Sequence, residues 1–130
     1  MNVSWLNLSL VGLGGSVGAA LRFIVGAAVS HVYGPLRYPL ATTCVNVSGC
    51  FLIGFLNELM LRRGGAAPEW SLFLVTGVLG GFTTFSAFGF EVFSLLRAGD
   101  VSTGVLAAAL QVILGLGAVY AGIRCAALLA

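Results

Sequence analysis

The chain has 130 residues, of which 59% are hydrophobic and only 8% are charged, and its mean hydropathy is +1.08. In soluble domains about a quarter of the residues are charged, so this composition excludes a soluble domain and predicts an integral membrane protein. The net charge of +2 comes from six scattered arginines against four carboxylates. That is too little for the clustered basic surface that nucleic-acid binding requires, so no nucleic-acid partner is expected.

Four apolar stretches are each long enough to cross a bilayer, which takes about 20 predominantly apolar residues in a helix. They cover residues 5–28, 40–61, 70–96 and 104–129, separated by short connections rich in turn-forming residues. The spans use up nearly the whole chain, so we expect a single all-α transmembrane domain over residues 1–130. No basic segment and no cleavage site precede the first apolar run, so this span is expected to remain in the mature protein.

The arginines give almost no signal for orientation in the membrane. If the N-terminus is cytoplasmic, Arg62, Arg63 and Arg124 lie on that side, and Arg37 and Arg97 lie on the other. Membrane proteins with one orientation carry a clear excess of positive charge on the cytoplasmic side. A chain without that bias is suited to inserting both ways round, and four short spans leave little room to enclose a pathway. Both features indicate a dimer, and an antiparallel one is among the arrangements open to it.

Small residues recur at the spacing that lets transmembrane helices pack closely. Two G-x-x-x-G pairs lie in the first and third spans, and a smooth face is expected on the fourth. These residues are Gly14, Gly18, Gly77, Gly81, Gly115, Gly117 and Ala121. The three cysteines, Cys44, Cys50 and Cys125, lie inside apolar runs without metal-ligand spacing, and we interpret them as small packing residues.

Few polar side chains fall at bilayer depth, and each must be satisfied inside the protein, which makes it a candidate functional residue. They are Arg22, Thr42, Asn46, Thr83, Thr84, Ser86, Glu91 and Gln111. Thr42 and Asn46 share one face of the second span. Asn46 either makes a hydrogen bond between helices or lines a polar path. Arg22 either extends to the membrane interface or contributes to a positive vestibule.

The third span carries the stretch GGFTTFSAFGF, residues 80–90, where a continuous helix is unexpected. Gly80 and Gly81 weaken a helix, and the hydroxyls of Thr83, Thr84 and Ser86 are suited to starting a new one. We therefore predict a helix broken near its middle, whose freed carbonyl and N–H groups are able to hold an ion. The alternative is an intact helix in which Thr and Ser hydrogen-bond to carbonyls one turn earlier.

Phe85, Phe88 and Glu91 recur on one face of the helix after this stretch. An aromatic stripe usually reflects packing, but phenyl rings also have a positive edge that attracts an anion weakly. Weak attraction suits a conducting site, because the ion must leave again. Glu91 needs a hydrogen-bond donor, which Gln111 or a nearby hydroxyl is positioned to provide.

Three ordered segments resemble the small bacterial fluoride channels of the Fluc or CrcB family. GGFTTFSAF resembles the family signature G-G-x-T-T-F-S-x-F, GGSVGAALRF resembles a Gly-rich run that ends in Arg, and VNVSGCFLIGF resembles a V-N-x-x-G segment. The likeness covers nearly the whole chain.

The resemblance implies an antiparallel, dual-topology homodimer in the plasma (inner) membrane, with two pores that pass fluoride passively out of the cell and a structural sodium ion at the dimer centre. Carried over by position, Gly80 and Thr83 would give backbone carbonyls to the sodium. Asn46, Phe85, Phe88, Thr42, Thr84 and Glu91 would line the fluoride pore, with Arg22 near its mouth. Such a channel is not an enzyme, and the chain shows no P-loop and no nucleophile with a base beside it.

The chain departs from the family at three positions. Gln111 stands where the family often has Ser or His, Gly115 where a Ser is frequent, and Ala87 replaces the usual Thr. The alternative function is a small proton-coupled multidrug exporter, which is also a four-span dimer. That class relies on a carboxylate in its first span, where this chain has Arg22 and no acid.

Overall fold

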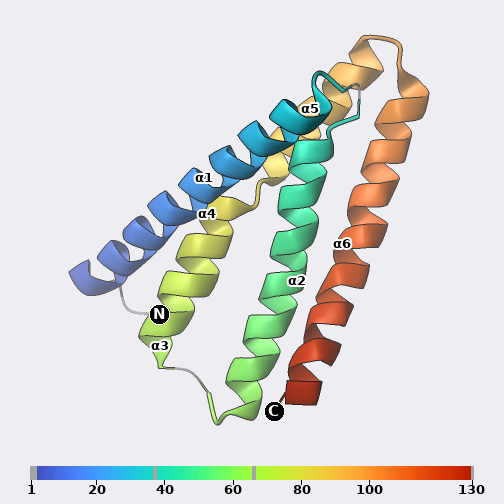
Figure 1. The fold of residues 1–130 in the computed structure, drawn as a ribbon. Helices are drawn as coiled ribbons and strands as arrows, with labels where there is room; N and C mark the ends of the chain where they lie inside the picture. Colours follow the sequence, from blue (N-terminus) through green and yellow to red (C-terminus); the bar gives the residue numbers. More distant parts are fainter. Residues whose placement is uncertain (1–2, 37, 66, 130) are drawn as a thin grey trace.

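The computed structural model describes residues 3–36, 38–65 and 67–129, and every regular element in this part of the chain is helical (Figure 1). The elements in chain order are α1 (Trp5–Tyr33), α2 (Leu40–Arg62), α3 (Pro68–Trp70), η1 (Ser71–Leu79), α4 (Gly80–Phe82), α5 (Phe85–Arg97) and α6 (Val101–Leu129). Arg37, which entered the expected charge balance, lies outside the described residues.

The expected four spans are confirmed, because four helical stretches are long and apolar enough to cross a membrane. Three of them match the predicted ranges to within three residues at either end. The first span was predicted to end at residue 28, but its helix continues through Ser30 and His31 to Tyr33. Hydrophilic side chains alone do not end a helix. This helix ends at Gly34, which has a φ of 66°, a positive value that glycine adopts readily, and whose N–H donates to the Ser30 carbonyl.

The third span consists of α3, η1, α4 and α5, and it is not uniform. Residues Ser71–Leu79 form a π-helix instead of the ordinary membrane helix expected from the sequence. Gly80 and Gly81 are helical, whereas Thr83 (φ −80°, ψ 156°) and Thr84 (φ −152°, ψ 111°) have extended backbone. The chain therefore leaves helical geometry at the two threonines rather than at the two glycines.

Two pairs of helices make the main contacts of the fold. Figure 1 shows α2 and α6 side by side, with α1 crossing the first half of the third span at an angle. The crossing depends on glycine, because a Cβ on Gly18 would overlap the Val78 carbonyl and one on Gly81 would overlap the Gly15 carbonyl. The two predicted G-x-x-x-G pairs thus face each other across α1 and the third span.

The small-residue face of α6 differs from the expected one. Gly115 is buried against Cys50, but Gly117 and Ala121 are exposed, and nothing lies within 4 Å of a Cβ built on Gly117. The buried small residues of α6 are Gly104, Ala107, Gly115, Gly122 and Ala126. The prediction was wrong about the other two positions because the face toward α2 follows the three- and four-residue steps of the helix, which lead from Gly115 to Gly122.

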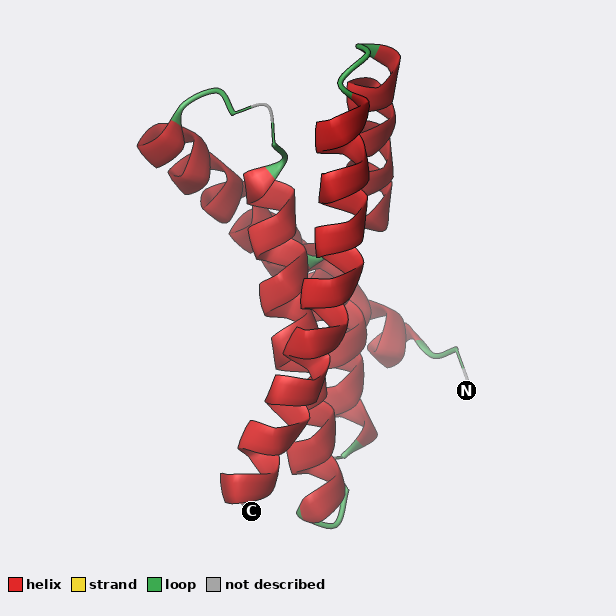
Figure 2. Cartoon of the chain, turned by 90° about the vertical axis from the view of Figure 1, so that its right-hand side faces the viewer, coloured by secondary structure: helices red, strands yellow, loops and turns green. Residues whose placement is uncertain are grey.

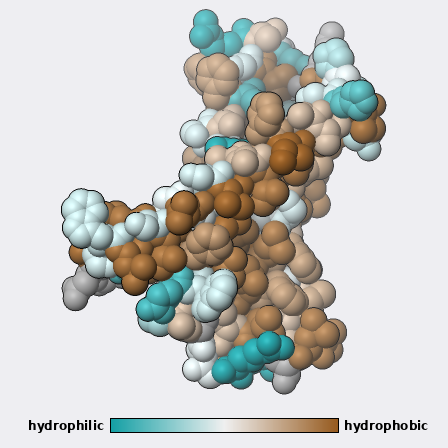
Figure 3. Space-filling model, turned by 60° about the vertical axis from the view of Figure 1, so that its left-hand side comes forward, coloured by the Kyte–Doolittle hydropathy of each residue, from teal (hydrophilic) through white to brown (hydrophobic). Residues whose placement is uncertain are grey.

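Most large apolar side chains lie on the outside of the chain. The buried hydrophobic residues are Val45, Leu79, Phe82, Ala107 and Ala126. Figure 3 shows hydrophobic residues over the middle of one face, with hydrophilic ones mainly toward its two ends. In Figure 2 the helices meet near the middle of the molecule and diverge above it. This distribution is typical of a surface suited to lipid rather than to water.

Candidate functional site

A single side chain of α2 holds Thr84, the second of the two extended residues of the third span. Asn46 Nδ2 donates to the Thr84 carbonyl oxygen at 3.0 Å, and the Thr84 N–H donates to Asn46 Oδ1 at 2.8 Å. Asn46 is only 7% exposed. One buried carboxamide therefore satisfies both backbone groups of Thr84, which would otherwise be costly at membrane depth.

This pairing releases backbone carbonyls that an unbroken α-helix would use. In such a helix the Thr84 N–H would donate to Gly80 and the Ala87 N–H would donate to Thr83. Here Thr84 N–H is taken by Asn46, and the Ala87 N–H donates to Thr84 Oγ1 at 3.2 Å, which caps α5. The carbonyls of Gly80 and Thr83 are thereby left without these helical donors.

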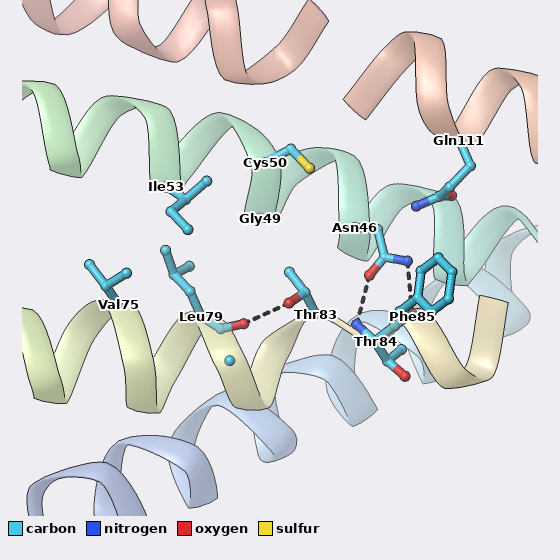
Figure 4. Close-up of a pocket in the computed structure, with 11 residues that line it drawn as sticks. Asn46, Gly49, Cys50, Ile53, Val75, Leu79, Thr83, Thr84, Phe85 and Gln111 are labelled. Atoms are coloured by element: carbon cyan, nitrogen blue, oxygen red, sulfur yellow. Dashed lines mark hydrogen bonds between the residues drawn. The ribbon is translucent and has the colours of Figure 1, made fainter. Parts of the chain in front are cut away.

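A hollow of about 330 Å³ lies beside the two threonines, between α2, the third span and α6 (Figure 4). Its polar lining comes from Asn46, Thr83, Thr84 and Gln111, and the rest is mainly apolar. Gly80 has no side chain, so its main chain is what lines the hollow. A mainly apolar hollow with a few convergent polar groups is typical of a site for a small ligand.

The two phenylalanines of the predicted pore lie at the start of α5. Phe85 lines the hollow and is 82% exposed in the single chain. Its ring centroid is 5.6 Å from that of Phe88, and the rings are tilted by 58°. Phe88 is partly buried and is not among the residues that line the hollow.

Thr42 and Glu91 form a second polar group, further toward the C-terminal end of α5. Thr42 Oγ1 donates to Glu91 Oε1 at 2.8 Å, so a hydroxyl supplies the donor that Glu91 needs. Glu91 Oε2 is buried and has no hydrogen-bond partner among the described residues. Glu91 also lines two further hollows, of about 350 and 210 Å³, near the connection between α1 and α2.

Arg22 lies beside a smaller hollow of about 180 Å³, which Thr42 and Thr84 also line. Thr84 thus lines both this hollow and the one at Asn46. Thr42, which lines the smaller hollow, is hydrogen-bonded to Glu91. The polar residues predicted for the site therefore follow one another along the molecule rather than surrounding a single cavity.

Two residues with polar or sulfur-containing side chains line the hollow but had no place in the predicted pore or sodium site. Cys50 was interpreted as a packing residue, yet it lines the hollow one helical turn from Asn46. Gln111 was a candidate functional residue because it is polar at bilayer depth, and the structure places it opposite Asn46. The spacing of Cys50 from Asn46 in α2 was the available signal, because residues four apart share a helix face.

Comparison with known proteins gives the same family throughout. The profile of the family described as CrcB-like protein, Camphor Resistance (CrcB), matches residues 9–123. The fluoride-specific ion channel FluC of Rhizobium meliloti (strain 1021) is 45% identical over 117 residues, which cover 90% of this chain and 93% of that protein. Proteins of the same name from Hyphomonas neptunium (48% over 116 residues; 88% and 90% covered) and Chlorobium phaeobacteroides (41% over 121 residues; 93% and 93% covered) are also similar.

The family profile reaches into all four spans and includes every residue of the site described above. The relatives are named as ion channels, which are not enzymes. With four apolar helices that can span a membrane, this is a multi-pass membrane protein, and in bacteria such a protein lies in the inner membrane. The chain belongs to the CrcB-like family.

Proposed function

We propose that this protein is a passive, fluoride-selective ion channel that lets cytoplasmic fluoride leave the cell and so protects against fluoride toxicity. The relatives' names support fluoride as the ion. The observation that carries the proposal is the extended backbone at Thr83 and Thr84, with Thr84 held by Asn46, beside a hollow at membrane depth. Non-helical backbone at that depth is typical of ion sites in channels and transporters.

The ion path passes Asn46, Phe85 and Thr84 and continues toward Thr42 and Glu91. A carboxamide nitrogen carries two hydrogens, and Asn46 uses one of them on the Thr84 carbonyl, which leaves one for an anion. The exposed ring of Phe85, with Phe88 behind it, offers electropositive edges that attract an anion without trapping it. Arg22 supplies positive charge at the hollow next to Thr42 and Thr84.

Two copies of the chain form the functional unit, arranged antiparallel and with two pores. The weak arginine bias suits a chain that inserts both ways round. The single chain also leaves Phe85 82% exposed, and the hollow at Asn46 is open to the outside of the chain. A second copy would cover this face and complete the walls of the path.

A structural sodium ion lies between the two copies, bound by the carbonyls of Gly80 and Thr83. The fit rests on the hydrogen bonds, because the N–H groups that would occupy these two oxygens in a helix are taken by Asn46 Oδ1 and Thr84 Oγ1. Gly80 is exposed and a Cβ built on it would meet nothing within 4 Å, so its main chain is open to a partner. Uncharged carbonyl oxygens suit a hard monovalent cation, which would neutralise part of their negative potential.

The test is ion flux from liposomes that contain the purified protein. Fluoride is expected to leave rapidly down its own gradient, with chloride scarcely moving and no proton gradient required. Protein-free liposomes are the control. Movement of a quaternary ammonium dye that depends on a proton gradient, without fluoride flux, would contradict the channel and indicate the multidrug exporter instead.

A further inference from the structure

Gln111 projects from α6 toward the hollow at Asn46. Figure 4 shows its carboxamide directed toward Asn46, with Phe85 close by in the same view. Gln111 is thus the polar side chain that α6 contributes to a lining otherwise formed by α2 and the third span. It has no part in the proposed pore as described above.

The carboxamide of Gln111 is incompletely hydrogen-bonded. Its Oε1 is buried and has no partner among the described residues. Rotating the amide would exchange the two atoms, so either orientation leaves one buried polar atom unpaired. Asn46 differs, because Thr84 engages both ends of its amide. A buried polar group without a partner is unfavourable, so the occupant of the hollow is the natural partner for Gln111.

The other polar groups around the hollow are less available than Gln111. Thr84 Oγ1 accepts from the Ala87 N–H, and Thr83 Oγ1 donates to the Leu79 carbonyl at 2.9 Å. Gln111 therefore has the full capacity of an amide, with a donor for an anion and an acceptor for a water molecule. A small, tightly hydrated anion that retains one water molecule needs a donor for itself and an acceptor for that water.

We propose that Gln111 determines selectivity in the ion path: its amide nitrogen donates to the passing anion while its oxygen accepts from a water molecule that accompanies it. This inference rests on the proposed fluoride channel. A donor of this strength compensates a small anion for the water it loses, and compensates a larger, more weakly hydrated anion less. Gln111 is thus a third contact for the ion, facing Asn46 and Phe85 from α6.

The experiment compares Gln111→Met, Gln111→Glu and Gln111→Asn with the wild-type protein in the liposome flux assay. Gln111→Met keeps the length of the side chain and removes both hydrogen-bonding groups, so fluoride flux is expected to fall about tenfold and the fluoride-to-chloride ratio to fall with it. Gln111→Glu keeps the shape and places a carboxylate at the path, so its flux is expected to fall further. Ile113→Met, two residues away on the 65% exposed outer face of α6, is the matched control and is expected to conduct normally.

Wild-type liposomes that pass no fluoride would overturn the proposed function and, with it, the basis of this inference. If the wild type conducts and Gln111→Met conducts equally well with the same ion ratio, Gln111 does not contact the ion. Flux through Gln111→Glu at or above that of Gln111→Met would have the same meaning. Conversion of Gln111→Met to monomers during size-exclusion chromatography would show that the unpaired oxygen bonds to the second copy, which also overturns the proposal. If the Glu variant does not fold, the inference is decided by Met against Asn, the shorter amide, which is expected to retain more of the selectivity.

Discussion

Asn46 both holds the backbone of the third span and faces the hollow. Its amide oxygen is oriented by the Thr84 N–H, so the nitrogen must point to the Thr84 carbonyl and into the hollow. The sequence allowed a bond between helices or a place in a polar path. The structure shows the first of these directly and leaves a hydrogen free for the second.

Changing Asn46 to Asp is expected to damage conduction and stability together. The carboxylate still accepts from the Thr84 N–H, but it confronts the Thr84 carbonyl with a second acceptor and places negative charge beside the proposed anion path. Fluoride flux is expected to fall by about a hundredfold or more, and the free energy of unfolding by about 1–3 kcal/mol. Liposome flux and thermal unfolding are the measurements.

Asn57→Asp is the matched control for this change, because Asn57 lies on the same helix but is exposed. It is expected to retain both flux and stability. Wild-type flux through Asn46→Asp would exclude Asn46 from the path.

At the scale of the helices, close backbone contact replaces the large apolar core of a soluble protein. A Cβ on Gly122 of α6 would overlap the Phe51 carbonyl of α2, and one on Gly54 of α2 would overlap the Val119 carbonyl. The two helices therefore approach each other through reciprocal glycines.

Replacing Gly122 with Ala is expected to lower the free energy of unfolding by about 1–3 kcal/mol, because the added methyl group must push α2 and α6 apart. Gly117→Ala on the same helix has open space and is expected to leave stability unchanged or slightly raised. Thermal unfolding in detergent measures both. Equal midpoints for the two variants would contradict the packing described here.

The helices also show what the sequence could and could not predict. The four spans and the close packing at the glycine pairs follow from hydropathy and three- or four-residue spacing and were predicted correctly, although the first span continues to Tyr33. The hydroxyls in the middle of the third span were predicted to start a new helix, and Thr84 does cap α5, but the extended backbone was not assigned to Thr83 and Thr84, because the sequence does not show that Asn46 is placed to bond Thr84. The π-helix of η1 likewise has no sequence pattern that distinguishes it from an ordinary membrane helix.

At the scale of the whole molecule, two observations concern the same open face of the chain. Gly80 and Phe85 are exposed there, and the carbonyls of Gly80 and Thr83 are released from helical hydrogen bonding. A second copy joined through a cation would account for both. The hydrogen bonds made by Asn46 Oδ1 and Thr84 Oγ1 thus leave free the carbonyls through which the two copies are proposed to join.

Removing sodium is expected to destabilise that assembly. A cation that binds only the folded dimer raises its stability by mass action, so the unfolding midpoint in sodium chloride is expected to exceed that in N-methyl-D-glucamine chloride by roughly 3 °C or more. Ionic strength is held equal, and size-exclusion chromatography follows the dimer in both salts. Identical midpoints would count against a structural sodium ion.

The double attachment of Thr84 to Asn46 has a consequence for how such a pore would be controlled. Two hydrogen bonds fix the Thr84 backbone, so any movement of this segment away from α2 would have to break both at once. A pore built around such a fixed segment would have no gate at this point and would stay open whether or not fluoride is present. Leakage of other ions would then be prevented only by the selectivity of the residues that line the pore. The direction of net fluoride flow would be set by its gradient.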